Sequence, residues 1–254
     1  AALENGYTPL SFKDVSETTF TYDSGRKEYT PKNVNNKFAE EEISLLQAMA
    51  ISDNIYAVKT LVDIGYDEYR DILKRFNLKF EQQDLPTIAL GTKENTLYNL
   101  TAAYNMIASK GQSIPATTIL SIENSEGEVI YEYEQPKNKQ VISEEDAFLL
   151  TDMMTGMFDA TLSDYSPATG LSIRPKMTHT YAGKSGTTNT DQWMIGYTPT
   201  LTAGVWNGYD QGKTLTTQTD LAATKRIWID FMESVLAGTK KQTFEVPDGV
   251  EGVL

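Results

Sequence analysis

Three short strand-like runs in the last third of the chain most constrain its fold. They are Tyr181–Thr188, Gln192–Thr198 and Leu201–Tyr209, and Pro199-Thr200 connects the last two. Consecutive strands joined by such tight turns pair antiparallel. The following residues 221–236 have a helical period and bring apolar side chains to one face. These side chains are Leu221, Ile227, Trp228, Phe231, Met232 and Val235. We therefore predict an antiparallel meander with a helix packed against it.

The middle of the chain is predicted to be mainly helical. Residues 39–62 show two apolar stripes that are interrupted at Ser52-Asp53-Asn54, which indicates two helices meeting at a polar corner, the first beginning at Glu40-Glu-Glu42. Further helices are predicted over residues 67–76, 97–110 and 144–157, and strands over residues 113–133. The polar residues 7–37 are expected to form a loop with one short hairpin.

Together these elements predict an α+β fold, an antiparallel sheet flanked by helices plus a helical subdomain. We assign residues 1–254 to one domain, with a mainly helical half at 38–160 and the sheet with its helix at 178–237. The first six residues, Ala-Ala-Leu-Glu-Asn-Gly, are typical of the last turn of a helix. We therefore expect the fold to be incomplete at the N-terminus.

Composition excludes several function classes. Lys and Arg number 22 against 35 Asp and Glu, and the resulting formal net charge of -13 disfavours nucleic-acid binding. The chain has no cysteine, so thiolate metal sites and a cysteine nucleophile are excluded. A single histidine, His179, excludes a multi-histidine metal site, and we expect it to have a surface or packing role. We expect neither a metal nor an organic cofactor.

The run Gly183-Lys-Ser-Gly-Thr-Thr188 fits three kinds of motif, and its neighbours decide among them. A phosphate-binding P-loop requires a glycine where Thr178 stands, and a phosphorylated-aspartate motif requires Asp where Gly183 stands. A peptide-binding edge strand requires neither. In such a strand Lys184 supplies a cation, the hydroxyls of Ser185 and Thr187 can bind a carboxylate, and Gly186 lets an acyl group approach the backbone. From these residues alone, a plain turn between strands remains an equal alternative.

The triplet Ser52-Asp-Asn54 is uninformative alone, because a Ser helix cap with an Asx turn has the same sequence. It stands, however, in a collinear series of short motifs along nearly the whole chain. The series is Tyr29-Thr-Pro-Lys-Asn33, Leu46 to Val58, Ala89-Leu-Gly91, Leu100-Thr-Ala-Ala-Tyr104, Gly111, Ala182 to Thr188, Asp191-x-Trp193 and Gly196-Tyr-Thr-Pro199. In this order and spacing the chain resembles the transpeptidase domain of class A penicillin-binding proteins.

The resemblance implies a peptidoglycan D,D-transpeptidase that forms a serine acyl-enzyme and is trapped by β-lactam antibiotics. Ser52 then matches a serine of the proton relay, and Asn54 matches the amide that orients the stem peptide or the β-lactam. Lys184 matches the lysine that tunes the relay. Thr187 matches the residue that completes the oxyanion hole and contacts the terminal carboxylate, with Ser185, Gly186 and Thr188 beside it on the substrate strand.

The family's nucleophile motif, Ser-x-x-Lys, has no match at the expected place, because the helix end that follows it corresponds to residues 2–6 here. Ser24-Gly-Arg-Lys27 keeps the spacing, but Gly25 and its polar neighbours argue against a rigid helix. We therefore expect the nucleophile upstream of Ala1, in a missing N-terminal segment of the same protein that is a partner of this chain, and we expect the fragment alone to be inactive. The site is expected on the extracytoplasmic face of the bacterial membrane.

Two other functions stay open at this stage. One is a D,D-carboxypeptidase or a β-lactamase-like hydrolase, which differs in passing the acyl group to water. The other is a non-catalytic binding or sensing module of the same fold. Asp191 and Trp193 are expected to shape the strand turn and the sheet core, and Tyr165 and Tyr181 are expected in the cleft or, more commonly for aromatics near strands, in the core.

Overall fold

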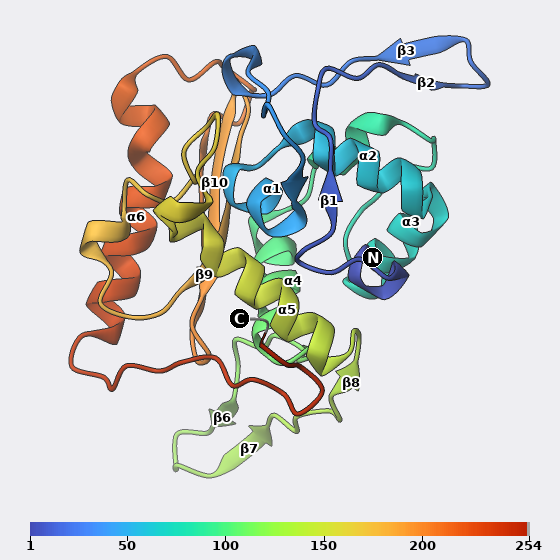
Figure 1. The fold of residues 1–254 in the computed structure, drawn as a ribbon. Coiled ribbons are helices and arrows are strands. Elements are labelled where there is room, and N and C mark those ends of the chain that lie inside the picture. Colours follow the sequence, from blue (N-terminus) through green and yellow to red (C-terminus); the bar gives the residue numbers. More distant parts are fainter. Residues whose placement is uncertain (253–254) are drawn as a thin grey trace.

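The chain folds around a three-stranded antiparallel sheet with helices on both faces (Figure 1). The structure is a computed structural model that describes residues 1–252, without the side chains of Asn35 and of residues 218–221. Strands β9 (Ala182–Thr187), β10 (Asp191–Tyr197) and β11 (Thr202–Gly208) lie in the order β11-β10-β9. Ile195 pairs with Lys184 on one side and with Gly204 on the other. The predicted α+β class and the antiparallel meander are confirmed.

Helix α6 (Gln218–Leu236) covers one face of the sheet (Figure 1). Trp228 and Met232 are fully buried, and the indole Nε1 of Trp228 donates to the carbonyl of Ala203 at 3.0 Å. The predicted apolar face of this helix is wrong in part, because three of its members are about half exposed. These are Ile227, Phe231 and Val235, while the side chain of Leu221 lies outside the described residues. The contact centres on Trp228 because Gly196 has no side chain and lets the indole approach the strand.

Helices α4 (Leu97–Ala108) and α5 (Glu144–Thr155) cover the opposite face. The α5 residue Thr151 hydrogen-bonds through its hydroxyl to the hydroxyl of Tyr197 at 2.8 Å. Gly204 packs directly against Thr101 of α4. Both helices lie within two residues of the predicted bounds, and together with the sheet they enclose one of the three buried core clusters.

Helices α1 (Leu45–Ile51), α2 (Asn54–Ile64) and α3 (Tyr66–Arg75) form the helical half (Figure 1). The predicted corner between the first two helices is confirmed. The predicted start at Glu40-Glu-Glu42 is wrong, because the Ser44 hydroxyl caps α1 by accepting from the Gln47 amide at 3.2 Å. Ser44 itself belongs to β4 (Ile43–Ser44), which pairs with β1 (Phe12–Lys13).

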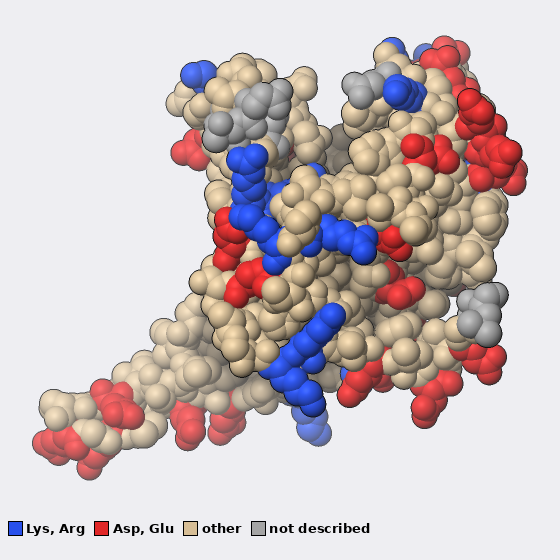
Figure 2. Space-filling view, turned by 60° about the vertical axis from the view of Figure 1, so that its left-hand side comes forward, with Lys and Arg blue, Asp and Glu red and all other residues tan. Residues whose placement is uncertain are grey.

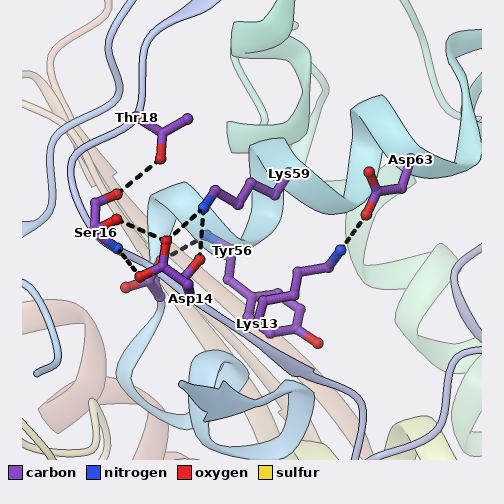
Figure 3. Close-up of polar contacts among 8 residues, drawn as sticks. Lys13, Asp14, Ser16, Thr18, Tyr56, Lys59 and Asp63 are labelled. Atoms are coloured by element: carbon purple, nitrogen blue, oxygen red, sulfur yellow. Dashed lines mark hydrogen bonds and ion pairs between the residues drawn. The ribbon is translucent and has the colours of Figure 1, made fainter. Parts of the chain in front are cut away.

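The N-terminal segment crosses α2 and is fastened to it by charged side chains (Figure 3). Lys59 of α2 donates to the carbonyl of Asp14 at 2.7 Å and pairs with its carboxylate, and Lys13 pairs with Asp63. The expected hairpin is formed by β2 (Phe20–Tyr22) and β3 (Lys27–Tyr29). Ahead of β1, the 3-10 turn Leu3–Asn5 ends at Gly6 with φ 82°.

The remaining elements are short. Strands β6 (Ser121–Glu123) and β7 (Val129–Glu132) form the hairpin predicted within residues 113–133, whereas the pair β5 (Gln112–Ser113) and β8 (Lys139–Gln140) has no sequence signal. The other 3-10 turns are η2 (Val34–Asn36), η3 (Pro86–Leu90), η4 (Gly156–Phe158), η5 (Ala160–Leu162) and η6 (Arg174–Lys176). Within residues 1–252, no helix is both long enough and apolar enough to cross a membrane.

Candidate functional site

Ser52 occupies the corner between α1 and α2 in a left-handed backbone conformation, with φ 60° and ψ 54°. The amide of the next residue, Asp53, donates to the carbonyl of Ala48 at 2.8 Å, which closes the end of α1. Asp53 then caps α2 by accepting from the amide of Tyr56. The corner is therefore fixed from both helices, and the half-buried Ser52 side chain is held at its tip.

Lys184 reaches this corner from β9. Its Nζ donates to the hydroxyl of Ser52 at 2.8 Å and to the carbonyl of Ser185 at 2.8 Å. The first of these bonds joins residues 132 positions apart in the sequence. The fold thus brings together the two sequence motifs that were individually ambiguous.

A second lysine, Lys225, contributes to the electrostatics of the site, and no sequence motif singles it out. Burial, and after it the positive charge of Lys225, lowers the pKa of the Lys184 ammonium to about 8. Burial also lowers the pKa of Lys225, whose Nζ donates to the carbonyl of Thr169 at 2.6 Å. In the described part of the chain neither lysine forms an ion pair. An amine with such a pKa can both accept and donate a proton near neutral pH.

Asn54 begins α2 next to this pair, but its side chain is already engaged. Its amide Nδ2 donates to the carbonyl of Lys32 at 2.8 Å, and its backbone amide donates to the Asn33 side chain at 2.8 Å. The structure therefore places Asn54 beside Ser52 and fixes its orientation. A side-chain amide held through Nδ2 still has its oxygen as an acceptor for a peptide N–H.

The other predicted site residues of β9 divide between the two faces of the strand. Alternation along the strand puts Lys184 and Gly186 on the same face, and Ser185 and Thr187 on the face of Met194 toward α6. The hydroxyls of Ser185 and Thr187 are thus not brought against Ser52. Since β9 is the last strand of the described sheet on that side, a molecule lying along its edge can reach groups of both faces.

Thr188 belongs to the β9–β10 turn. Its hydroxyl accepts from the backbone amides of Asp191 at 2.9 Å and Thr190 at 3.1 Å. The carboxylate of Asp191 in turn accepts from the indole Nε1 of Trp206 at 2.9 Å. The turn-shaping role predicted for Asp191 is confirmed.

Two other candidates lie away from this site. Ser24 stands in an exposed turn with φ 57°, which agrees with its exclusion as a nucleophile. The ring of His179 contacts the hydroxyls of Thr178 at 3.0 Å and Thr239 at 3.3 Å, as expected for a packing role. Among residues 1–252, no cluster of three or more His, Cys, Asp or Glu side chains could hold a metal ion.

Comparison with known sequences identifies related proteins along the whole chain. The family described as the penicillin binding protein transpeptidase domain matches residues 1–233. Penicillin-binding protein 2D of Bacillus subtilis (strain 168) is 43% identical over 252 residues, which are 99% of this chain and 36% of that protein. Penicillin-binding protein 1A of Aquifex aeolicus (strain VF5) is 30% identical over 251 residues, 97% of this chain and 33% of that protein. The chain spans about a third of the length of these relatives.

Solved structures show the same fold. The crystal structure of penicillin-binding protein 1A from Haemophilus influenzae superposes with a TM-score of 0.87 at 22% identity, covering 97% of this chain and 42% of that one. The PonA1 protein from Mycobacterium tuberculosis in complex with penicillin V gives a TM-score of 0.79 at 22% identity, covering 98% and 69%. At these identities the likeness concerns the fold alone.

Proposed function

Because this chain belongs to the transpeptidase family of penicillin-binding proteins, we propose that it is the substrate-binding part of a peptidoglycan D,D-transpeptidase. The enzyme crosslinks stem peptides through a serine acyl-enzyme, and β-lactams trap the same serine. The observation that carries this proposal is the hydrogen bond from Lys184 to Ser52. It joins the motif that contains Ser52 and Asn54 to the motif on β9, which is an edge strand of the sheet.

In this proposal the half-buried Lys184 and the Ser52 hydroxyl pass a proton between the acylated serine and the leaving or attacking amine. The pKa of Lys184, about 8, supports this role because both protonation states are accessible near neutral pH. Asn54 orients the donor peptide. The edge residues Ser185, Gly186, Thr187 and Thr188 bind its backbone and terminal carboxylate, with the Thr187 amide in the oxyanion hole.

We place the acylated serine outside residues 1–254, in a segment of the same protein that docks beside Ser52 and Lys184. Two features support this assignment. Ser52 occupies a left-handed corner in which its hydroxyl already accepts from Lys184, and the one Ser-x-x-Lys sequence, at Ser24, lies in an exposed turn. The site then works on the outer side of the bacterial membrane, where peptidoglycan is built.

The test is labelling of the parent protein with a fluorescent penicillin. We expect one labelled serine outside residues 1–254, no labelling of residues 1–254 alone, and acylation slowed about 100-fold or more by Lys184→Ala at an unchanged melting temperature. Lys137→Ala, in an exposed segment, is the matched control and should acylate at the wild-type rate.

Other outcomes of this experiment would overturn the proposal in defined ways. Labelling followed by rapid release to water, with no transfer to an amine, would indicate a carboxypeptidase or a β-lactamase-like hydrolase. A folded parent protein that is never labelled would indicate a binding or sensing module. A wild-type acylation rate in Lys184→Ala would show that Lys184 has no role in the proton relay.

A further inference from the structure

Asp53 lies between the two site residues Ser52 and Asn54 but points into the protein. It is 4% exposed, and its carboxylate accepts three hydrogen bonds. The donors are the Tyr56 amide at 2.6 Å, the Asn33 Nδ2 at 2.8 Å and the Tyr165 hydroxyl at 2.6 Å. A helix cap requires only the first of these bonds. The other two attach the corner to distant parts of the chain.

Asn33 and Tyr165 come from separate segments of the chain, and both donate to Asp53 at this corner. Asn33 lies 20 residues before Asp53 and is 6% exposed, and Tyr165 lies 112 residues after it. Asn33 uses both ends of its side chain, donating to Asp53 and accepting from the backbone amide of Asn54 at 2.8 Å. Asn33 thus hydrogen-bonds to two consecutive residues of the corner, Asp53 and Asn54, and Ser52 is the residue immediately before them.

The chemistry of this arrangement is unusual for a structural cap. All three donors to Asp53 are neutral, and none of the ion pairs among residues 1–252 includes this carboxylate. Burying a carboxylate without a cation is costly, and removing one of its donors leaves an unsatisfied charged acceptor. Such a network tolerates few geometries.

We infer that Asn33, Asp53 and Tyr165 form a positioning unit that holds the Ser52 hydroxyl against Lys184 and fixes the Asn54 amide for substrate. The three residues do not touch the substrate themselves. Their effect on acylation rests on the proposed function, whereas their effect on the Ser52–Lys184 hydrogen bond does not.

The first experiment removes single donors in the parent protein. Tyr165→Phe deletes one hydroxyl at nearly constant volume, and Asn33→Asp replaces a donor by a second carboxylate. We expect each variant to lower the rate constant of β-lactam acylation about 10- to 100-fold, with a smaller change in the initial binding constant, because a small displacement of Ser52 disturbs the reaction geometry. A purely structural role would lower the melting temperature and leave this rate constant unchanged in the folded protein.

Matched controls exist in the same chain. Tyr69 donates its hydroxyl to the carbonyl of Ile88 at 2.9 Å, and the Asn95 side chain accepts from the Lys79 amide at 2.9 Å. Tyr69→Phe and Asn95→Asp remove or alter comparable hydrogen bonds away from the corner. Both should acylate at the wild-type rate.

A reciprocal exchange provides the rescue. In Asn33→Asp combined with Asp53→Asn, the residue at 53 donates to the carboxylate at 33, which still accepts from the Asn54 amide. We expect the double variant to acylate several-fold faster than either single variant, although Tyr165 loses its acceptor. Absence of any recovery would count against the unit.

Crystal structures of the same parent variants separate this inference from the proposed function. In Tyr165→Phe and Asn33→Asp we expect the 2.8 Å distance between Lys184 Nζ and Ser52 Oγ to lengthen beyond hydrogen-bonding reach. If the wild-type parent is never acylated, the proposed function fails while this measurement still tests the unit. An unchanged distance together with unchanged acylation rates would overturn the inference.

Discussion

Ser52 holds a backbone conformation, φ 60° and ψ 54°, that a glycine adopts with less strain. A serine there costs stability, and its hydroxyl is used by Lys184 rather than by a helix cap. Strained residues of this kind collect at functional sites, where the surrounding structure enforces them. The strain and the function of Ser52 can therefore be measured separately.

We predict that Ser52→Gly is more stable than Ser52→Ala by about 1 kcal/mol, because only glycine relieves the positive φ. Both variants lose the hydroxyl, so both should slow β-lactam acylation of the parent protein. Urea unfolding gives the stabilities and penicillin labelling gives the rates.

Asn77, with φ 56° at the end of α3, serves as the control for this prediction. Asn77→Gly should relieve less strain, because asparagine tolerates a positive φ better than serine does, and it should leave acylation unchanged. Equal stability of the two Ser52 variants would show that the corner is not strained, and a wild-type acylation rate in either would show that the hydroxyl is dispensable.

At the residue scale, the sequence predicted the site residues that belong to a family motif and missed the site residues that do not. Ser52 and Lys184 were selected by family spacing, and the structure joins them. Lys225 was not selected, because a lysine on an amphipathic helix is normally solvated, and its contact with Thr169 depends on how α6 packs. The roles inferred for Asn33 and Tyr165 likewise depend on contacts between distant segments.

At the scale of elements, two glycines of the sheet differ in whether the packing of the fold requires them. A Cβ at Gly196 of β10 would lie 2.5 Å from the Trp228 ring and 2.8 Å from the carbonyl of Ala182. A Cβ at Gly186 of β9 would meet only Trp193, at 3.5 Å, which is an ordinary van der Waals contact. The packing of the described fold therefore does not require a glycine at position 186. We propose that glycine stands there because the substrate approaches the backbone closely.

We predict that Gly186→Ala changes the free energy of unfolding by less than about 1 kcal/mol yet slows acylation at least about 10-fold, since the methyl group occupies the edge where the acyl group lies. Gly196→Ala should instead be destabilised by about 1–3 kcal/mol through overpacking against Trp228. Thermal unfolding and penicillin labelling of the parent variants test both statements. A wild-type acylation rate in Gly186→Ala would contradict the edge-strand assignment.

The sequence predicted that these helices and strands exist, but it did not predict which face of α6 is exposed or where α1 begins. Periodicity located α2 to α6 and the three strands of the sheet, because long apolar patterns and turn residues are local signals. The exposed side of α6 depends on the space left by Gly196, and the start of α1 depends on the Ser44 cap. The pair β5–β8 joins residues 112–113 with 139–140, a contact that no local pattern specifies.

At the scale of the whole molecule, charge is unevenly distributed. Despite a formal net charge of -13, Lys and Arg side chains gather near the centre of the face in Figure 2, below a notch between two lobes, and acidic side chains lie mainly at its periphery. A locally positive face suits an anionic substrate, whereas the acidic remainder repels polyanions.

The last prediction concerns stability in alkali, because each of the three buried clusters contains a tyrosine that is at most 2% exposed. Burial raises the pKa of Tyr56, Tyr181 and Tyr197 above the ordinary value near 10. Above pH 10 the unfolded chain therefore releases protons that the folded chain keeps, and stability must fall as pH rises. These three phenols contribute about 4 kcal/mol per pH unit once they are ionised in the unfolded chain, and the raised pKa values of Tyr104 and Tyr165 add to the loss. Lys184, with its lowered pKa of about 8, acts in the opposite direction between pH 8 and its unfolded pKa near 10.4. Urea unfolding between pH 7 and 11.5 should thus show a shallow rise followed by a steep loss, and Tyr197→Phe should reduce the slope of that loss by about 1.4 kcal/mol per pH unit, the contribution of one phenol. Stability that stays level to pH 11 would mean that these phenols ionise inside the folded protein and that the clusters admit water.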